Sequence, residues 1–130
     1  MDRPENMKYC VVGNIVKEHT DKDGTVRYGS RAFPGGRKVY ITRHLWHGEV
    51  EVLGMNRYKT YVYDRVPLEL IENIRFKRTL SPIMVERMKN THEFPDTWWG
   101  YKEEDRIGAM EYAELLNRIK AGETKEQTLL

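Results

Sequence analysis

Residues 33–78 most constrain what this chain can fold into, because short stretches of alternating apolar and polar residues follow one another there with only tight turns between them. Alternation over residues 38–42, and again over residues 49–53, is typical of strands that are buried on one face. A third stretch, residues 59–66, ends at Pro67, which cannot donate to a strand ladder. The pattern therefore predicts short antiparallel strands joined by tight turns.

The second and third of these stretches form a predicted hairpin. A turn centred near Asn56 would place Val50 opposite Val62 and Glu51 opposite Tyr61. A slip by one residue would bury the glutamates, so the pairing of apolar residues with one another supports this register.

Further strands precede and follow this hairpin. Residues 8–16 are apolar on both faces, as expected of a strand that is covered on two sides or bends at Gly13. A turn at residues 21–24 predicts that residues 25–29 pair back on the end of that first strand. One helical turn is predicted at residues 68–70, and residues 71–78 form a closing strand. These elements predict a small closed β-barrel of about five strands.

Two helices are predicted after the barrel. Ser81 and Pro82 are typical of a helix start, and a helix is predicted from Pro82 to about Lys89. A second helix is predicted from Asp105 to Ala121. Its apolar face comprises Ile107, Met110, Ala113 or Leu116, and Ile119. The chain is thus predicted to be a single domain, residues 1–130, with the barrel at 8–78, a helical extension at 79–122 and a flexible tail at 123–130.

This order of elements resembles the second half of an SH3-like barrel. The resemblance covers residues 8–78, and its motifs are Val66-Pro67 before Leu70-Ile71 and Gly35-Gly36 before Val39. It implies a mainly β fold with C-terminal helices, and a binding module more than an enzyme.

A second resemblance concerns the segments Gly13-Asn14-Ile15-Val16, Tyr28-Gly29-Ser30 and Gly36 to Tyr40. These phrases are similar to those of small bacterial proteins of uncharacterised function. Some proteins of that kind protect a cell against a toxin made by its kin. The resemblance therefore implies a bacterial immunity protein whose partner is a toxin domain.

Composition and charge limit the classes of protein to which this chain can belong. The lone cysteine, Cys10, excludes an internal disulfide framework and predicts a reducing, cytoplasmic compartment. No apolar run approaches the roughly 20 residues that span a bilayer, so no membrane partner is predicted. The net charge is +2, but residues 25–66 hold eight basic and three acidic residues. The positive charge is therefore expected on the barrel.

The residues that carry chemistry form no convincing catalytic or metal-binding set. His44 and His47 lie near Glu49, but a strand sends residues three apart to opposite faces, so we predict no metal site. Cys10 lies in an apolar strand and is interpreted as a small core residue. The segment 35–38 lacks phosphate-loop spacing and is interpreted as a turn. No catalytic residue and no cofactor are predicted.

One face of the predicted barrel interleaves basic and aromatic side chains. Tyrosine and arginine are enriched at protein interfaces, whereas lysine and arginine beside rings also suit single-stranded nucleic acid. A third interpretation is that a C-terminal helix covers this face. The two tryptophans at residues 98–99 either contact a partner or fold back and fill the open end of the barrel. The predicted partner-binding residues are Lys38, Tyr40, Lys59, Tyr61, Tyr63, Arg65, Trp98 and Trp99.

These observations predict a non-enzymatic cytoplasmic protein that binds another macromolecule. The most specific hypothesis is an immunity protein that binds and neutralises a toxin domain. The alternative is RNA or single-stranded DNA binding through the basic, aromatic face. An enzyme that uses Cys10, or His44 with His47, is a third hypothesis, and the sequence names no substrate for it. The oligomeric state is not predicted.

Overall fold

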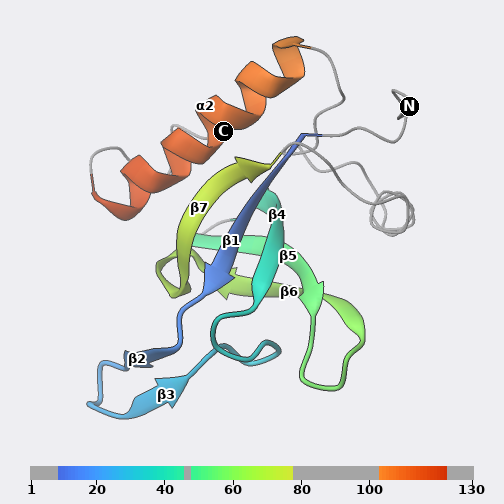
Figure 1. The fold of residues 1–130 in the computed structure, drawn as a ribbon. Coiled ribbons are helices and arrows are strands. Elements are labelled where there is room, and N and C mark those ends of the chain that lie inside the picture. Colours follow the sequence, from blue (N-terminus) through green and yellow to red (C-terminus); the bar gives the residue numbers. More distant parts are fainter. Residues whose placement is uncertain (1–8, 46–47, 78–102, 123–130) are drawn as a thin grey trace.

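The structure is a computed structural model that describes residues 9–45, 48–77 and 103–122. These residues form a five-stranded antiparallel sheet, a separate two-stranded hairpin and a C-terminal helix (Figure 1). The strands are β1 (Cys10–Ile15), β2 (Glu18–Thr20), β3 (Val26–Tyr28), β4 (Lys38–His44), β5 (Glu49–Met55), β6 (Tyr61–Pro67) and β7 (Ile71–Lys77). A 3-10 turn covers Leu68–Leu70, and the helix is α2 (Glu103–Lys120).

The five-stranded sheet is open, so the prediction of a closed barrel is wrong. Its strand order is β6-β5-β4-β1-β7, and within the described residues no pairing joins β6 to β7. Helix α2 packs against β7 and β1 instead. Two of its side chains also donate hydrogen bonds to backbone carbonyl groups of β7. Asn117 Nδ2 donates to Ile74 O at 3.1 Å, and Lys120 Nζ donates to Ile71 O. A helix thus lies beside β7, where closure would require a strand.

One of the two predicted C-terminal helices is matched by α2, which begins two residues before the predicted start at Asp105. The other, residues 82–89, lies outside the described residues, as do Trp98, Trp99 and the predicted tail. The prediction of two helices is therefore not matched. No helix in the described part of the chain is long and apolar enough to cross a membrane.

The larger core lies between the sheet and α2. From the helix it takes Ala109, Ala113 and Leu116, whose spacing of four and three residues places them on one face. The prediction that Ile107 belongs to this face is wrong, because Ile107 is 43% exposed. From the sheet and its connections the larger core takes Val11, Ile15, Phe33, Val39, Ile41, Val50, Val52, Val66, Leu68, Ile71 and Ile74.

A second cluster occupies the other face of the sheet. Neighbouring strand residues point to opposite faces, so Val11 enters the larger core while Val12 enters this cluster. Its buried members are Cys10, Val12, Tyr40 and Leu53, and Tyr61 and Tyr63 pack against them. The prediction that residues 8–16 form a strand covered on both faces is confirmed for Cys10–Ile15.

The register of the β5–β6 hairpin differs from the predicted one. Val50 pairs with Val66 and Glu51 with Arg65, four residues further along β6 than expected. The reason is local: Asn56 opens the turn, and its Oδ1 accepts hydrogen bonds from the amides of Tyr58 and Thr60, both at 2.9 Å. The shift is an even number of residues, so the predicted assignment of side chains to faces survives.

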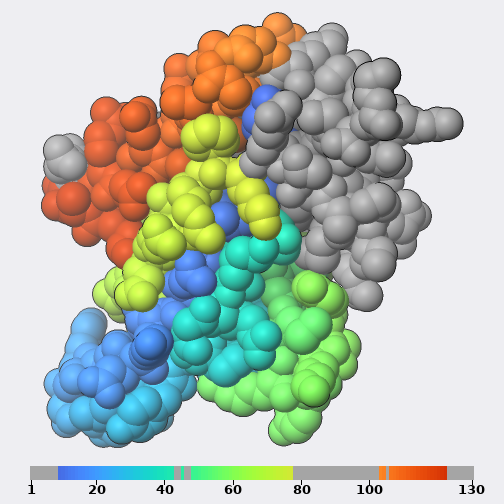
Figure 2. Space-filling view, viewed as in Figure 1, coloured from blue at the N-terminus to red at the C-terminus, as the bar shows by residue number. Residues whose placement is uncertain are grey.

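The β2–β3 hairpin projects from the end of the sheet that lies away from α2 (Figures 1 and 2). Its register, with His19 opposite Arg27, confirms the predicted pairing around the turn at residues 21–24. Gly24 has φ +87, a left-handed conformation that favours glycine in this turn. The hairpin forms a sheet of its own and leaves all three residues of β3 exposed.

Candidate functional site

The structure separates the predicted partner-binding residues into groups. Tyr61, Tyr63 and Arg65 lie at alternate positions of β6 and share a face, as predicted. Lys59 does not extend that face, because it lies in the β5–β6 turn with φ +64. Trp98 and Trp99 lie outside the described residues, so the structure does not decide between their two interpretations.

Tyr40 is a buried member of the second cluster and offers little ring surface to a ligand. Its side chain is 8% exposed, and burial raises its pKa. The ammonium group of Lys38 lies 5.3 Å from the centre of its ring, a cation–π contact. Tyr61 and Tyr63 are half-buried and pack on the same cluster. The three predicted tyrosines thus do not form a fully exposed stacking platform.

Arg65 forms an ion pair across the strands with Glu49, with 3.2 Å between Nη2 and Oε1. Glu49 belongs to β5 and Arg65 to β6, so this is an ordinary ion pair between neighbouring strands. Arg65 also faces a different hollow from Lys38, Tyr40 and Tyr61. The members of the predicted set that line a hollow are therefore divided between two places on the protein.

The first place, here called the hairpin hollow, has a volume of about 940 Å³. One wall is β3 with the loop that follows it, residues 26–31, and His19 joins them from β2. The other wall is the sheet end, where Glu49, Arg65 and Pro67 meet Leu70 of the 3-10 turn. The hollow thus lies between the hairpin and the main sheet.

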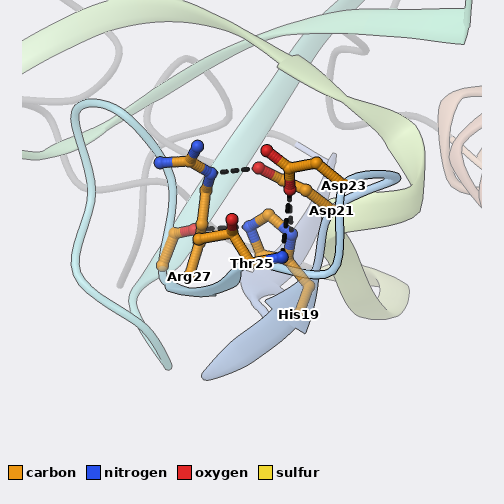
Figure 3. A network of polar contacts seen from close by, with 6 residues as sticks. His19, Asp21, Asp23, Thr25 and Arg27 are labelled. Carbon is orange, nitrogen blue, oxygen red and sulfur yellow. Dashed lines mark hydrogen bonds and ion pairs between the residues drawn. The ribbon is translucent and has the colours of Figure 1, made fainter.

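A polar network gives the hairpin its shape (Figure 3). Arg27 Nε donates to Asp21 Oδ2, and His19 Nδ1 lies 3.7 Å from the other carboxylate oxygen of Asp21. The Thr25 amide donates to Asp23 Oδ1 at 3.0 Å and thereby lowers the pKa of Asp23. Both strands and the turn between them are therefore linked by side chains.

The loop after β3 is anchored at two points. Arg57, from the β5–β6 turn, donates to the carbonyl of Arg31 at 3.0 Å and to that of Tyr28 at 3.3 Å. Phe33 is fully buried in the larger core, and its amide and carbonyl bond Ser30 Oγ and Ser30 N at 3.2 and 2.9 Å. These contacts fix the wall of the hairpin hollow against the sheet.

Each arginine of the hairpin hollow is paired with a carboxylate. The three pairs are Arg27 with Asp21, Arg31 with Asp64, and Arg65 with Glu49. Pairing with Asp64 raises the pKa of Arg31, and pairing with Asp21 raises that of Arg27. The hollow therefore has a mixed and largely balanced charge.

Two large apolar side chains remain exposed on this hairpin. Tyr28 is 70% exposed and Val26 is 48% exposed. The sequence reasoning assigned these residues to a pairing strand and missed them as candidate contacts. A signal for their exposure is the short length of the strand. A strand of three residues that pairs with only one neighbour has too little structure around it to bury both Val26 and Tyr28.

The second place, here called the glycine-turn hollow, has a volume of about 520 Å³. It is lined by residues 34–38, Tyr40, Met55 and Tyr61. The Gly36 amide donates to Ile15 O at 2.7 Å, and the Arg37 amide to Pro34 O at 3.2 Å. These amides are therefore not available to cradle a phosphate. The interpretation of residues 35–38 as a turn is confirmed for Gly35 and Gly36, whereas Lys38 begins β4.

Cys10 is unsuited to act as a nucleophile. It is buried in the second cluster, and burial raises the pKa of its thiol to about 12, although nearby Lys77 and Lys38 oppose this shift. The thiolate, which is the reactive form, is nearly absent at neutral pH. Its interpretation as a small core residue is confirmed.

Histidine and acidic side chains do not converge on a metal site in the described part of the chain. His44 ends β4, and His47 lies outside the described residues. The enzyme hypothesis that rests on these two histidines stays a prediction.

Comparisons of the chain with models of protein families, with curated proteins and with solved structures returned no significant match.

Proposed function

We propose that this protein binds another protein through the hairpin hollow. One observation carries the proposal: exposed Tyr28 and Val26 stand beside arginines whose charges are already balanced by neighbouring carboxylates. Tyrosine and arginine are enriched in the energetically dominant parts of protein interfaces. The hairpin hollow offers both residue types on a backbone that Arg57 and Phe33 hold in place.

The balance of charge favours a protein over a nucleic acid at this place. Nucleic-acid binding gains most of its free energy when unpaired cations displace counterions from phosphates. Arg27, Arg31 and Arg65 each lie beside a carboxylate, so little net positive charge is left at this place to attract phosphates. A protein surface with acidic and basic groups of its own can instead exchange partners with these pairs while an apolar side chain contacts Tyr28.

A toxin domain is the first partner that we propose. The resemblance to small bacterial immunity proteins suggests it, and so does a projecting hairpin suited to enter or cover a concave surface. The gene for such a toxin is expected beside the gene for this protein. In this proposal the protein neutralises its partner by occlusion, and it needs no chemistry of its own.

The proposal is tested by site-specific photo-crosslinking. A photoreactive phenylalanine replaces Tyr28 in one variant and Ile107 in a control variant, because Ile107 is also exposed but lies on α2. In native cells, position 28 is expected to crosslink to one discrete protein, and position 107 is not. Equal crosslinking from both positions, or crosslinking of position 28 to RNA, would contradict the proposal.

Affinity measurements with the captured partner complete the test. Tyr28→Ala is expected to weaken binding about 30-fold, which corresponds to the loss of about 2 kcal/mol at a hot spot. The free energy of unfolding should change by less than about 0.5 kcal/mol, because exposed side chains contribute little to stability. The affinity should fall only modestly with salt, whereas a steep fall would indicate phosphate contacts and favour the RNA or single-stranded DNA alternative.

A further inference from the structure

We propose that the glycine-turn hollow binds an anion that carries a phosphate group. This site is separate from the hairpin hollow, and its existence does not depend on the proposed protein partner. The proposal rests on three features of the hollow: its uncompensated positive charge, an unsatisfied guanidinium nitrogen and its size.

The hollow is basic, and none of the described residues that line it is acidic. Arg37 and Lys38 belong to the lining, and the side chain of Lys17 passes near Gly36, with Cε 4.0 Å from the position that a Cβ of Gly36 would take. Among the residues that the structure describes, none of these three cations forms an ion pair. In the hairpin hollow, by contrast, each arginine forms an ion pair with a carboxylate.

Lys77 adds a further positive charge next to Lys38. It pairs with Cys10 across the β1–β7 ladder, on the face that carries Tyr40 and Lys38. The proximity of Lys38 lowers the pKa of Lys77, and burial of the group lowers it further. Two ammonium groups in this arrangement repel each other, and a bound dianion would convert that repulsion into attraction.

Arg37 supplies the unsatisfied donor. Its Nε is buried and has no hydrogen-bond acceptor among the described residues. Buried donors are nearly always satisfied, by protein, by water or by a bound ion. Guanidinium groups bind carboxylate and phosphate oxygens in a planar, two-point geometry. Because none of the described lining residues supplies a carboxylate, a phosphate group of a ligand is an acceptor that fits this residue.

The volume of about 520 Å³ exceeds what a bare phosphate fills and lies within the usual range of small-ligand sites, about 300–1,000 Å³. Met55 and Tyr61 line the remainder of the hollow with partly apolar surface. The phosphate can therefore belong to a free phosphorylated molecule or to one unit of a nucleic-acid backbone. The chemistry at Arg37 and Lys38 is the same in both cases.

The test uses the whole chain, labelled with ¹⁵N, and two probes at low ionic strength: pyrophosphate and an oligothymidylate of about eight nucleotides, a length within known site sizes. Amide shifts are expected at residues 35–38. Lys38→Gln should weaken pyrophosphate binding about tenfold or more, because it removes a charge-assisted hydrogen bond. Lys22→Gln is the matched control, since Lys22 is exposed at the hairpin turn.

The two probes distinguish the source of the phosphate. Tighter binding of the oligonucleotide than of pyrophosphate, at the same amides, indicates a nucleic-acid backbone, and the reverse order indicates a free phosphorylated molecule. The amide spectrum shows whether each variant is folded, and Lys77→Gln serves as the second charge-removing variant. Absence of amide shifts at residues 35–38 with both probes, or equal weakening by Lys38→Gln and Lys22→Gln, would overturn the proposal.

Discussion

Gly54 occupies a position in β5 where no larger residue fits without adjustment. A Cβ at this position would lie 2.7 Å from Val39 Cγ1 and 3.1 Å from Phe33 Cε1. Carbon atoms in good van der Waals contact are about 3.5–4.0 Å apart. Gly54→Ala therefore forces Val39 or the Phe33 ring to move within the larger core.

The expected cost combines two opposing contributions. Overpacking a core by a methyl group costs about 1–3 kcal/mol, because neighbouring side chains leave their preferred rotamers. Replacing glycine in a strand recovers about 0.5–1 kcal/mol, because the unfolded alanine chain has less freedom to lose. Both neighbours of Gly54 are fully buried and cannot yield toward solvent. We therefore expect the free energy of unfolding to fall by about 1–2 kcal/mol.

Urea unfolding of four proteins measures this cost and its origin: the wild type, Gly54→Ala, Val39→Ala and the double variant. Val39→Ala removes Cγ1, which is the closest obstacle to the added methyl group. Gly54→Ala should therefore cost about 1 kcal/mol less in the Val39→Ala background than in the wild type, a coupling typical of residues in contact. Equal costs in the two backgrounds, or an unchanged urea midpoint for Gly54→Ala, would refute the steric reasoning.

The packing of α2 and the state of Cys10 give two further predictions. Leu116→Ala should cost about 2–5 kcal/mol of stability in urea, because it leaves a cavity between α2 and the sheet, whereas Ile107→Ala should stay within about 0.5 kcal/mol; similar costs would contradict the observed helix face. Burial raises the pKa of Cys10 from 9.0 to about 12, so its thiol should react with Ellman's reagent at pH 8 at least about 100-fold more slowly in the folded protein than in urea. The pKa of Cys10 is higher in the folded than in the unfolded protein, so burial of the neutral thiol contributes its full stability below about pH 9 and loses it as the pH rises toward 12. Between pH 7 and about pH 10.5, the free energy of unfolding of the wild type should therefore fall by up to about 2 kcal/mol more than that of Cys10→Ala. An equal loss in both proteins would contradict the burial of this thiol.

The sequence predicts those parts of the fold that depend on neighbours along the chain. The alternation of apolar and polar residues in β4 and β5 predicts which residues face the larger core. Pro67 followed by Leu68–Leu70 predicts the 3-10 turn. The helical spacing of apolar residues predicts both ends of α2 to within two residues. These signals are local, because each depends on residues a few positions apart.

The errors arise where distant residues decide the outcome. Closure of the barrel depends on what lies beside β7, and alternation within a strand carries no information about an α2 residue such as Asn117. The hairpin register depends on the bonds that the Asn56 side chain forms with later amides. A count of turn residues misses this, because it treats Asn56 as the middle of the turn instead of its start.

The candidate site shows the same division. Alternation predicts that Lys38 and Tyr40 share a face with Tyr61 and Tyr63, and the structure agrees. It does not predict that Lys38 covers the ring of Tyr40, since that depends on burial of the second cluster. Nor does it predict that Arg31, outside any strand, pairs with Asp64 of β6. The balance of charge that distinguishes the two hollows is therefore a property of the folded chain.

The two hollows nevertheless depend on one segment. Residues 29–31 line the hairpin hollow and residues 34–38 line the glycine-turn hollow, so Phe33 lies between the two linings. Its fully buried ring contacts the site of Gly54 and thereby fixes both linings to β5. The clash expected for Gly54→Ala falls on the Phe33 ring, which lies in the chain between two surfaces with different charge. A rigid anchor lets each hollow keep its geometry before a ligand arrives, so less binding free energy is lost to ordering either surface.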